Sequence, residues 1–150
     1  MAGRLEGKIC VVTGATRGIG RGCAVALAEE GATIYITGRS NGDGELTLKG
    51  SIAAIEKAGG IGIGTQVDHA NDAEIEAFFK KVAAEAGKID ILVGNAGVNP
   101  YFGPMNEIPD AAYEKTMKTN VQSNLWLAQM VVPDMIEKKR GSILLTASVV

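Results

Sequence analysis

Residues 9–20 read Ile-Cys-Val-Val-Thr-Gly-Ala-Thr-Arg-Gly-Ile-Gly, and this stretch decides the fold. Its first four residues form an apolar run without alternation, which is typical of a strand covered on both faces of a sheet. Apolar residues at helical spacing follow as far as Glu30, and Gly31 stands where a helix C-cap is expected. The pattern therefore predicts a strand over 9–12, a glycine-rich turn, and a helix over 19–30.

The same alternation continues along the chain. Further apolar runs predict strands over 33–37, 61–67, 89–93 and 142–146. Further helical patterns predict a helix ending near Lys57, a helix from a cap at Asp72 to Ala86, and a long helix from Asp110 to Lys138 that Pro133 kinks. Five strands separated by helices are typical of an α/β fold with a doubly wound parallel, Rossmann-like sheet. We expect one such domain over residues 1–150, truncated after the fifth strand.

Composition and charge limit the function. The chain has 15 basic and 17 acidic side chains, so its formal net charge of -2 offers no broad positive field for nucleic acid or an anionic membrane. Cys10 and Cys23 are too few for a disulfide framework, which favours a reducing, cytoplasmic location. His69 is the single histidine and has no partners at metal-ligand spacing. It is interpreted as a polar residue at a strand end, and no metal site is expected.

The turn after the first strand indicates phosphate binding. Gly14, Gly18 and Gly20 stand where backbone must approach a pyrophosphate or where helix and strand must touch, and the helix N-terminus offers unpaired N–H donors to an anion. In this strand–turn–helix setting the spacing predicts a dinucleotide site. A merely tight turn is the alternative. An ATP-type phosphate loop fits less well, because no Gly-Lys-Ser/Thr follows any predicted strand.

The sequence resembles the short-chain dehydrogenase/reductase family over all 150 residues, and in particular its NADPH-dependent carbonyl reductase-type members. The stretch 13–20 is similar to the family's Thr-Gly-x-x-x-Gly-x-Gly cofactor turn, Asn95-Ala96-Gly97 to its Asn-Ala-Gly motif, and Asp68 to the aspartate that lies near the adenine. The resemblance implies an oxidoreductase that transfers hydride between a nicotinamide cofactor and a small-molecule carbonyl or alcohol. The cofactor-binding residues that it implies are Gly14, Thr16, Arg17, Gly18, Ile19, Gly20, Arg39, Asp68, Asn95, Ala96 and Gly97.

Charge after the second strand bears on the choice of cofactor. Where NAD-dependent relatives place an acid that binds the ribose hydroxyls, this chain has Gly38 and then Arg39, and Arg17 lies in the glycine turn. Two guanidinium groups can meet a 2′-phosphate with charge-assisted hydrogen bonds, so NADP(H) is favoured over NAD(H). Solvated surface arginines are the alternative, and Asp43 or Glu45 could pair with Arg39.

Two members of the family's catalytic set have matches in this chain. Asn120 is similar to the asparagine that holds a water of the proton relay, and Ser148 to the serine that hydrogen-bonds the substrate oxygen. Their alternatives are a helix-kink residue and a loop cap. Residues Asn99, Tyr101 and Phe102 are expected to border the substrate pocket.

The family's Tyr-x-x-x-Lys pair is not found within the 150 residues. The residues four positions after Tyr35, Tyr101 and Tyr113 are Arg39, Met105 and Met117. In the family the pair follows the serine on a further helix, so we expect this chain to lack the C-terminal part of the family fold and to be inactive alone. Strand five should then be an unpaired edge, and an apolar stripe of Trp126, Leu127 and Met130, which in relatives packs between subunits, should be exposed. A homo-oligomer is expected at full length.

Three functions remain open at this point. The leading one is the cofactor-binding part of an NADP(H)-dependent oxidoreductase. The second is a non-catalytic NADP(H)-binding module or inactive truncated product, which the missing tyrosine and lysine favour. The third is a nucleotide-free scaffold for protein contacts, which leaves the glycine turn without a use.

Overall fold

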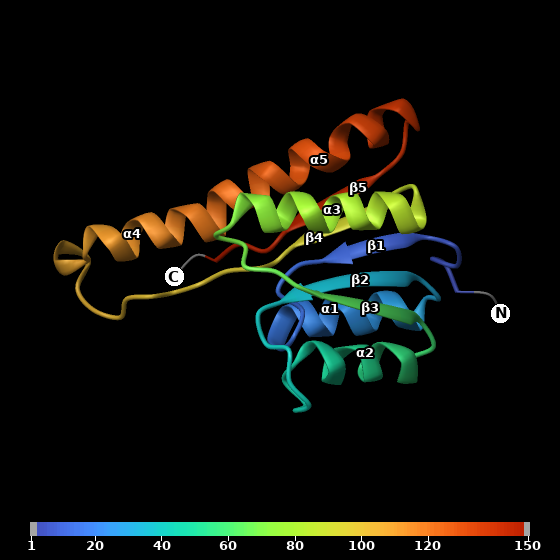
Figure 1. Ribbon diagram of the computed structural model, residues 1–150, viewed down its shortest axis with the longest axis horizontal. Coiled ribbons are helices and arrows are strands. Elements are labelled where there is room, and N and C mark those ends of the chain that lie inside the picture. The colour runs from blue at the N-terminus through green and yellow to red at the C-terminus, as the bar shows by residue number, and fades with distance from the viewer. Residues whose placement is uncertain (1–2, 149–150) are drawn as a thin grey trace.

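The computed structural model describes residues 3–148, in which strands and helices alternate (Figure 1). The strands are β1 (Ile9–Val12), β2 (Thr33–Gly38), β3 (Ile61–Gln66), β4 (Ile91–Gly94) and β5 (Ser142–Leu145). The helices are α1 (Gly18–Glu29), α2 (Leu48–Lys57), α3 (Asp72–Ala86), the 3-10 turn η1 (Met105–Glu107), α4 (Asp110–Met117), the π turn η2 (Lys118–Gln122) and α5 (Ser123–Glu137). The predicted alternation is confirmed, and element ends differ from the prediction by about two residues at most.

The five strands form one parallel sheet in the order β3-β2-β1-β4-β5. The chain moves outward from β1 through β2 to β3 and then returns to β4 on the other side of β1. The topological switch point therefore lies between β1 and β4, where Cys10 pairs with Ile91 and Val12 with Val93. Ligands of such sheets bind beyond the carboxyl ends of the strands at this point.

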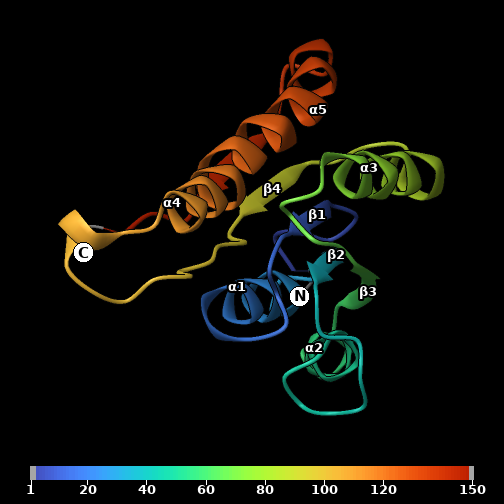
Figure 2. The same ribbon diagram turned by 60° about the vertical axis from the view of Figure 1, so that its left-hand side comes forward.

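Helices cover both faces of the sheet. Figure 2 shows α1 and α2 on one face, and α3 and α5 on the other. Side chains of β1 alternate between the two cores: Cys10 and Val12 pack under α1 and α2, whereas Val11 packs under α3 and α5. All three are fully buried, which explains the continuous apolar run in this strand. The fold is the predicted doubly wound α/β domain.

Two predicted helix caps differ in detail. Asn71 rather than Asp72 caps α3, because its side-chain oxygen accepts the N–H groups of Ala73 and Glu74, and Asp72 is the first helical residue. The C-cap of α1 is Glu30, and Gly31 follows it with φ 85°, the left-handed conformation that glycine adopts without strain.

The long helix predicted over 110–138 is present as α4, η2 and α5 in succession, with a π turn at its centre. The prediction that this helix exposes an apolar stripe of Trp126, Leu127 and Met130 was wrong for Leu127. Leu127 is fully buried, while Trp126 and Met130 are partly buried against the same core. Helical spacing places Leu127 on one face with Val131 and Met135, and that face packs toward α3 and β4. The large apolar side chains that this helix exposes are Tyr113, Met117, Val121, Leu125 and Ile136.

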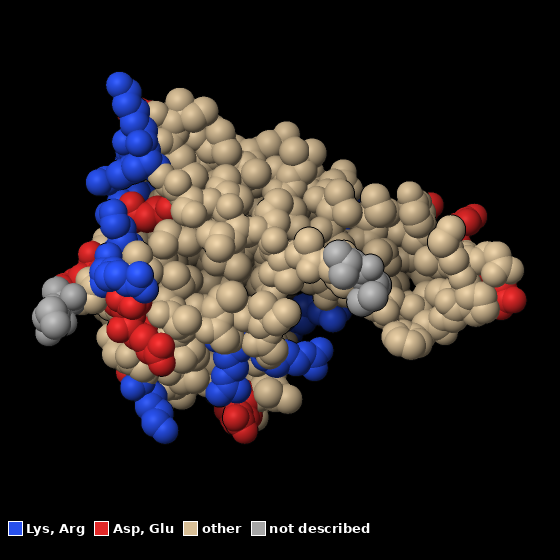
Figure 3. Space-filling view, turned by 180° about the vertical axis from the view of Figure 1, so that it is seen from behind, with Lys and Arg blue, Asp and Glu red and all other residues tan. Residues whose placement is uncertain are grey.

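Strand β5 is one of the two edge strands of the sheet, as expected, and exposes Ile143, Leu144 and Leu145. Figure 3 shows a broad surface without charged side chains on the far side of the view in Figure 1, with Lys, Arg, Asp and Glu gathered at its rims. Within residues 3–148, none of the helices has the length and apolar content that a membrane crossing requires.

Candidate functional site

A cleft lies at the carboxyl ends of β1, β2, β3 and β4. Its walls come from the segment that follows each of these strands and from η2. The lining residues are Gly14, Thr16, Arg17, Gly38, Arg39, Ser40, Val67, Asp68, His69, Asn95, Ala96, Gly97, Val98 and Thr119. The structure thus brings together eight of the eleven residues proposed to bind the cofactor. The other three, Gly18, Ile19 and Gly20, form the first residues of α1 beside this cleft.

The glycines of the turn are required for two reasons, backbone conformation and close contact. Gly14 and Gly18 have φ values of 64° and 57°, which residues with a Cβ rarely adopt. A Cβ on Gly14 would also lie 2.8 Å from Cα of Ala96. A Cβ on Gly20 would lie 2.4 Å from both the carbonyl oxygen of Gly14 and Nδ2 of Asn95. The turn therefore depends on close contact between the first helix, the first strand and the segment after β4.

The N-terminus of α1 has no cap from its own sequence. Its N-cap residue Arg17 makes no side-chain capping bond, and its first turn contains no acidic residue. In contrast, Thr47 caps α2 through the N–H of Gly50, and Asn71 caps α3. Because the first amides of a helix otherwise lack intrahelical partners, the N-terminus of α1 is suited to an anion.

Asn95 holds the turn in place across the switch point. Its Nδ2 donates to the carbonyl oxygens of Thr13 at 3.1 Å and Gly14 at 3.2 Å, and its backbone N–H donates to Oγ1 of Thr13 at 2.9 Å. Its Oδ1 accepts from Oγ1 of Thr146 at 3.0 Å. Asn95 therefore ties together the carboxyl ends of β1, β4 and β5.

His69, interpreted from the sequence as a polar residue at a strand end, is buried and lines the cleft. It follows β3, and its Nε2 lies 2.7 Å from Oγ1 of Thr37 on β2. Burial is the largest cause that lowers the pKa of His69 to about 4, against the opposing charges of Asp68 and Glu74. The imidazole is therefore neutral at pH 7. Sequence reasoning missed this contact, and the one available signal was its place directly after Asp68.

Asp68 is exposed, and its backbone and carboxylate form hydrogen bonds with the segment that leads into α3. Its N–H donates to Oε2 of Glu74 at 2.7 Å, and its Oδ1 accepts the N–H of Ala70 at 2.9 Å. Its other carboxylate oxygen has no hydrogen bond within residues 3–148.

Arg17 and Arg39 give the cleft its positive charge. Both are exposed, and neither forms an ion pair with any residue in the described range 3–148. The acids that could have neutralised Arg39 have other partners, since Asp43 pairs with Lys49 and Glu45 with Arg21. Both guanidinium groups therefore remain available to a phosphate.

Asn120 joins η2 to the segment after β4. Its Oδ1 accepts the N–H of Val98 at 2.7 Å, its Nδ2 donates to the carbonyl of Val98 at 2.9 Å, and its own carbonyl accepts from Nδ2 of Asn124 at 2.8 Å. Asn120 does not itself line the cleft, whereas its neighbour Thr119 does. Ser148 is exposed and lies three residues beyond β5.

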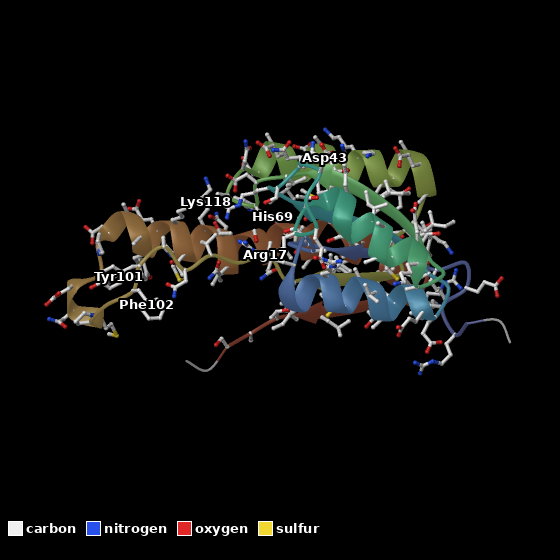
Figure 4. All side chains as sticks on the ribbon, turned by 90° about the horizontal axis from the view of Figure 1, so that it is seen from below. Arg17, Asp43, His69, Tyr101, Phe102 and Lys118 are labelled. Carbon is white, nitrogen blue, oxygen red and sulfur yellow. The ribbon has the colours of Figure 1, made fainter. Side chains whose placement is uncertain are left out.

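None of the three tyrosines lies in the cleft. Tyr35 is buried in β2, Tyr113 is exposed on α4, and the hydroxyl of Tyr101 donates to the carbonyl of Pro104. Figure 4 shows Tyr101 and Phe102 together, well away from Arg17 and His69. Asn99, Tyr101 and Phe102 therefore do not border this cleft. The described residues also contain no group of three His, Cys, Asp or Glu side chains placed to hold a metal ion.

A doubly wound sheet with a glycine turn and an uncapped helix N-terminus at its switch point is typical of a nucleotide-binding α/β protein. Comparison with known proteins gives the family: the sequence model of the short chain dehydrogenases matches residues 8–150. The chain belongs to that family, whose members are oxidoreductases, and the resemblance noted from the motifs is confirmed.

Individual relatives differ in substrate and cofactor. The chain is 34% identical over 140 residues to a 2-dehydro-3-deoxy-D-gluconate 5-dehydrogenase of Formosa agariphila, covering 93% of this chain and 52% of that protein. It is similar in structure to a metagenomic short-chain oxidoreductase in complex with NADP (TM-score 0.88, 35% identity, 97% of this chain and 64% of that one). It is also similar to an NADH-dependent reductase complexed with NAD (TM-score 0.86, 25% identity, 99% and 63%). The chain spans about half the length of the curated relatives that it matches.

Proposed function

We propose that this chain provides the nucleotide-binding part of an NADP(H)-dependent oxidoreductase that interconverts a carbonyl and a secondary alcohol. The observation that carries the proposal is the uncapped N-terminus of α1, which lies beside a cleft lined by Arg17 and Arg39. Donors for a pyrophosphate and two cations for a 2′-phosphate thus occur at one end of the sheet.

The residues present fit such a cofactor. A Cβ on Gly18 would meet nothing within 4 Å, so the space over the turn is open. The amides of Gly18, Ile19 and Gly20 would hold the pyrophosphate, and Arg17 and Arg39 the 2′-phosphate. The free carboxylate oxygen of Asp68 would accept from the adenine amino group. Thr16, Asn95, Ala96 and Gly97 would form the remaining walls.

The bound cofactor supplies the hydride. Ser148 would donate a hydrogen bond to the substrate oxygen, which favours the charge that develops there during reduction. Asn120 would position the loop after β4, because its side chain fixes the backbone of Val98 at both N and O. Its role in holding a water of the proton relay is taken from its similarity to the family's asparagine. A Tyr-x-x-x-Lys pair, which would donate a proton to the substrate, does not occur within residues 1–150.

A second candidate function is an NADP(H)-binding module without turnover. The two candidates share the cleft and differ only in chemistry. A binding assay cannot separate them, whereas a turnover assay can.

Location and assembly are part of the same proposal. Cys10 and Cys23 are both free thiols, which supports a reducing, cytoplasmic environment. The exposed apolar side chains at Tyr113, Met117 and Val121 support a homo-oligomer in the full-length protein.

Titration calorimetry with NADPH and NADH tests the proposal. We expect saturable NADPH binding and at least about tenfold weaker NADH binding, because one or two charge-assisted hydrogen bonds are lost without the 2′-phosphate. Equal affinities would contradict the NADP(H) preference, and no binding of either nucleotide would contradict the proposed function. NADPH oxidation with small ketones by the full-length protein then separates the enzyme from the binding module.

A further inference from the structure

We propose that His69 is a positioning residue for the glycine turn, acting through the hydroxyl of Thr37 on the backbone amide of Gly14. The inference rests on the proposed function, since it assumes that the turn holds a pyrophosphate. It assigns a role to His69, the one buried titratable side chain among the described residues that line the cleft.

Two hydrogen bonds connect His69 to the turn. Nε2 of His69 lies 2.7 Å from Oγ1 of Thr37, and the N–H of Gly14 donates to the same oxygen at 3.3 Å. Thr37 is fully buried and His69 is 4% exposed, so solvent does not compete for these bonds. The connection runs across three strands, from the segment after β3, through β2, to the turn after β1. Figure 4 shows His69 and Arg17 on the same side of the molecule, where α1 begins.

We assign the direction of the first bond by counting protons, because Nε2 can donate or accept according to the tautomer of the ring. A threonine hydroxyl has one proton and two lone pairs, and Gly14 already uses one lone pair of Thr37. Within residues 3–148 the only other hydrogen-bond partner of this hydroxyl is His69. A neutral imidazole with its proton on Nδ1 lets Nε2 accept that proton. Burial keeps the ring neutral at pH 7, because the pKa of His69 is lowered to about 4.

The consequence of this bond lies at Gly14. The carbonyl of Thr37 accepts the N–H of Ala15 at 2.9 Å, so Thr37 holds two consecutive amides of the turn. The Ala15 bond uses backbone atoms and would survive any side chain at position 37. The Gly14 bond requires a hydroxyl whose lone pair faces the turn, and His69 fixes that orientation by accepting the hydroxyl proton.

Stability alone does not account for an imidazole at this position. Nδ1 of His69 is buried and has no hydrogen-bond partner in the described part of the chain. A buried polar group without a partner destabilises the folded state, and an apolar side chain of similar size would avoid that loss. An imidazole here is therefore better explained by its contact with Thr37 than by packing.

Matched variants test the role. His69→Gln keeps an acceptor near the position of Nε2, whereas His69→Met has a similar shape and no comparable acceptor. We expect His69→Met to weaken NADPH binding by about 3- to 10-fold, the value of one hydrogen bond, and His69→Gln to stay within about twofold of wild type. Adenosine 2′-monophosphate has no pyrophosphate, so its affinity should change by less than about twofold in both variants.

The dependence on Thr37 gives a second test. In a Thr37→Val background, His69→Met should cause no further loss of NADPH affinity. Unliganded protein provides a readout free of the cofactor: hydrogen exchange of the Gly14 amide should accelerate in His69→Met and stay unchanged in His69→Gln. If His69→Met does not fold, Thr37→Ser and Thr37→Val make the same comparison.

The outcomes distinguish this inference from the proposed function. Unchanged NADPH affinity and Gly14 exchange in His69→Met would overturn the inference. Equal losses for NADPH and adenosine 2′-monophosphate would also overturn it, because the ring would then act on the base end of the nucleotide. If wild-type protein binds no NADPH, the proposed function fails, and exchange at Gly14 still decides whether His69 positions the turn.

Discussion

We expect alanine substitutions at two glycines in the first turns of α1 to have opposite effects on stability. Gly20 is buried against the glycine turn, whereas Gly22, two residues further along, is exposed. A Cβ on Gly22 would meet nothing within 4 Å, but a Cβ on Gly20 would lie 2.4 Å from the Gly14 carbonyl oxygen and from Nδ2 of Asn95. Gly20→Ala must therefore displace the turn, and Gly22→Ala must not.

The magnitudes follow from packing and helix propensity. Inserting a methyl group into a close contact destabilises the folded state by about 1–3 kcal/mol, and alanine in place of glycine in a helix stabilises it by about 1 kcal/mol. Gly20→Ala should therefore lower the free energy of unfolding by about 1 kcal/mol, and Gly22→Ala should raise it by a similar amount. Because the displaced turn carries the phosphate-binding amides, Gly20→Ala should also weaken NADPH binding by at least about tenfold.

Urea unfolding and NADPH titration of the two variants measure both effects. Gly22→Ala is the control and should bind NADPH like wild type. Wild-type affinity in a folded Gly20→Ala variant would refute the reasoning, because a turn forced from its place would then bind the nucleotide equally well.

Three further predictions concern single side chains. Arg39→Ala should weaken NADPH binding by about 10- to 100-fold, because a charge-assisted hydrogen bond is lost, and should leave NADH binding unchanged. Arg140→Ala is the control. A parallel loss of affinity for both nucleotides would count against a 2′-phosphate contact. The folded-state pKa of His69 lies below its unfolded value, so its contribution to stability is present above pH 6.5 and is lost as the pH falls from 6.5 through about 4, by about 3 kcal/mol in total. Unfolding measured across that range should show this slope, and an equal slope in His69→Met would assign it to other groups. Asn95→Asp would place a carboxylate against two carbonyl oxygens of the turn and should lower the free energy of unfolding by at least about 2 kcal/mol, whereas Asn99→Asp in the exposed loop should have little effect. Similar unfolding midpoints for these two variants would argue against a stabilising role of the Asn95 hydrogen bonds to the turn.

The fold could be predicted because the residues of both cores recur in regular apolar patterns along the sequence. The apolar run of β1 reports burial on two faces, and the spacing of Ile75, Phe78 and Val82 reports the buried side of α3. The π turn could not be predicted, since it coincides with a contact between Asn120 and Val98, 22 residues away. Which side of α5 is buried likewise depends on how the helix rotates against α3, and this is why Leu127 was misplaced.

The candidate site was predicted only where a motif or a strand end marked it. The glycine turn, Arg39, Asp68 and Asn95 each follow a parallel strand, so the topology brings them to one edge of the sheet. The contact between Thr37 and His69 was not predicted. It requires the register of β2 against β3 and the course of the chain after β3, and neither can be derived from spacing in one sequence.

The central claim is that the first amides of α1 bind the pyrophosphate of a nicotinamide dinucleotide. Backbone amide chemical shifts recorded during an NADPH titration test it residue by residue. The account predicts saturable shifts at Gly18, Ile19 and Gly20 with one common dissociation constant, together with little change at the C-terminal end of α3, near Ala86, which lies at the opposite end of the strands. Saturable binding that leaves these three amides unshifted would contradict the account.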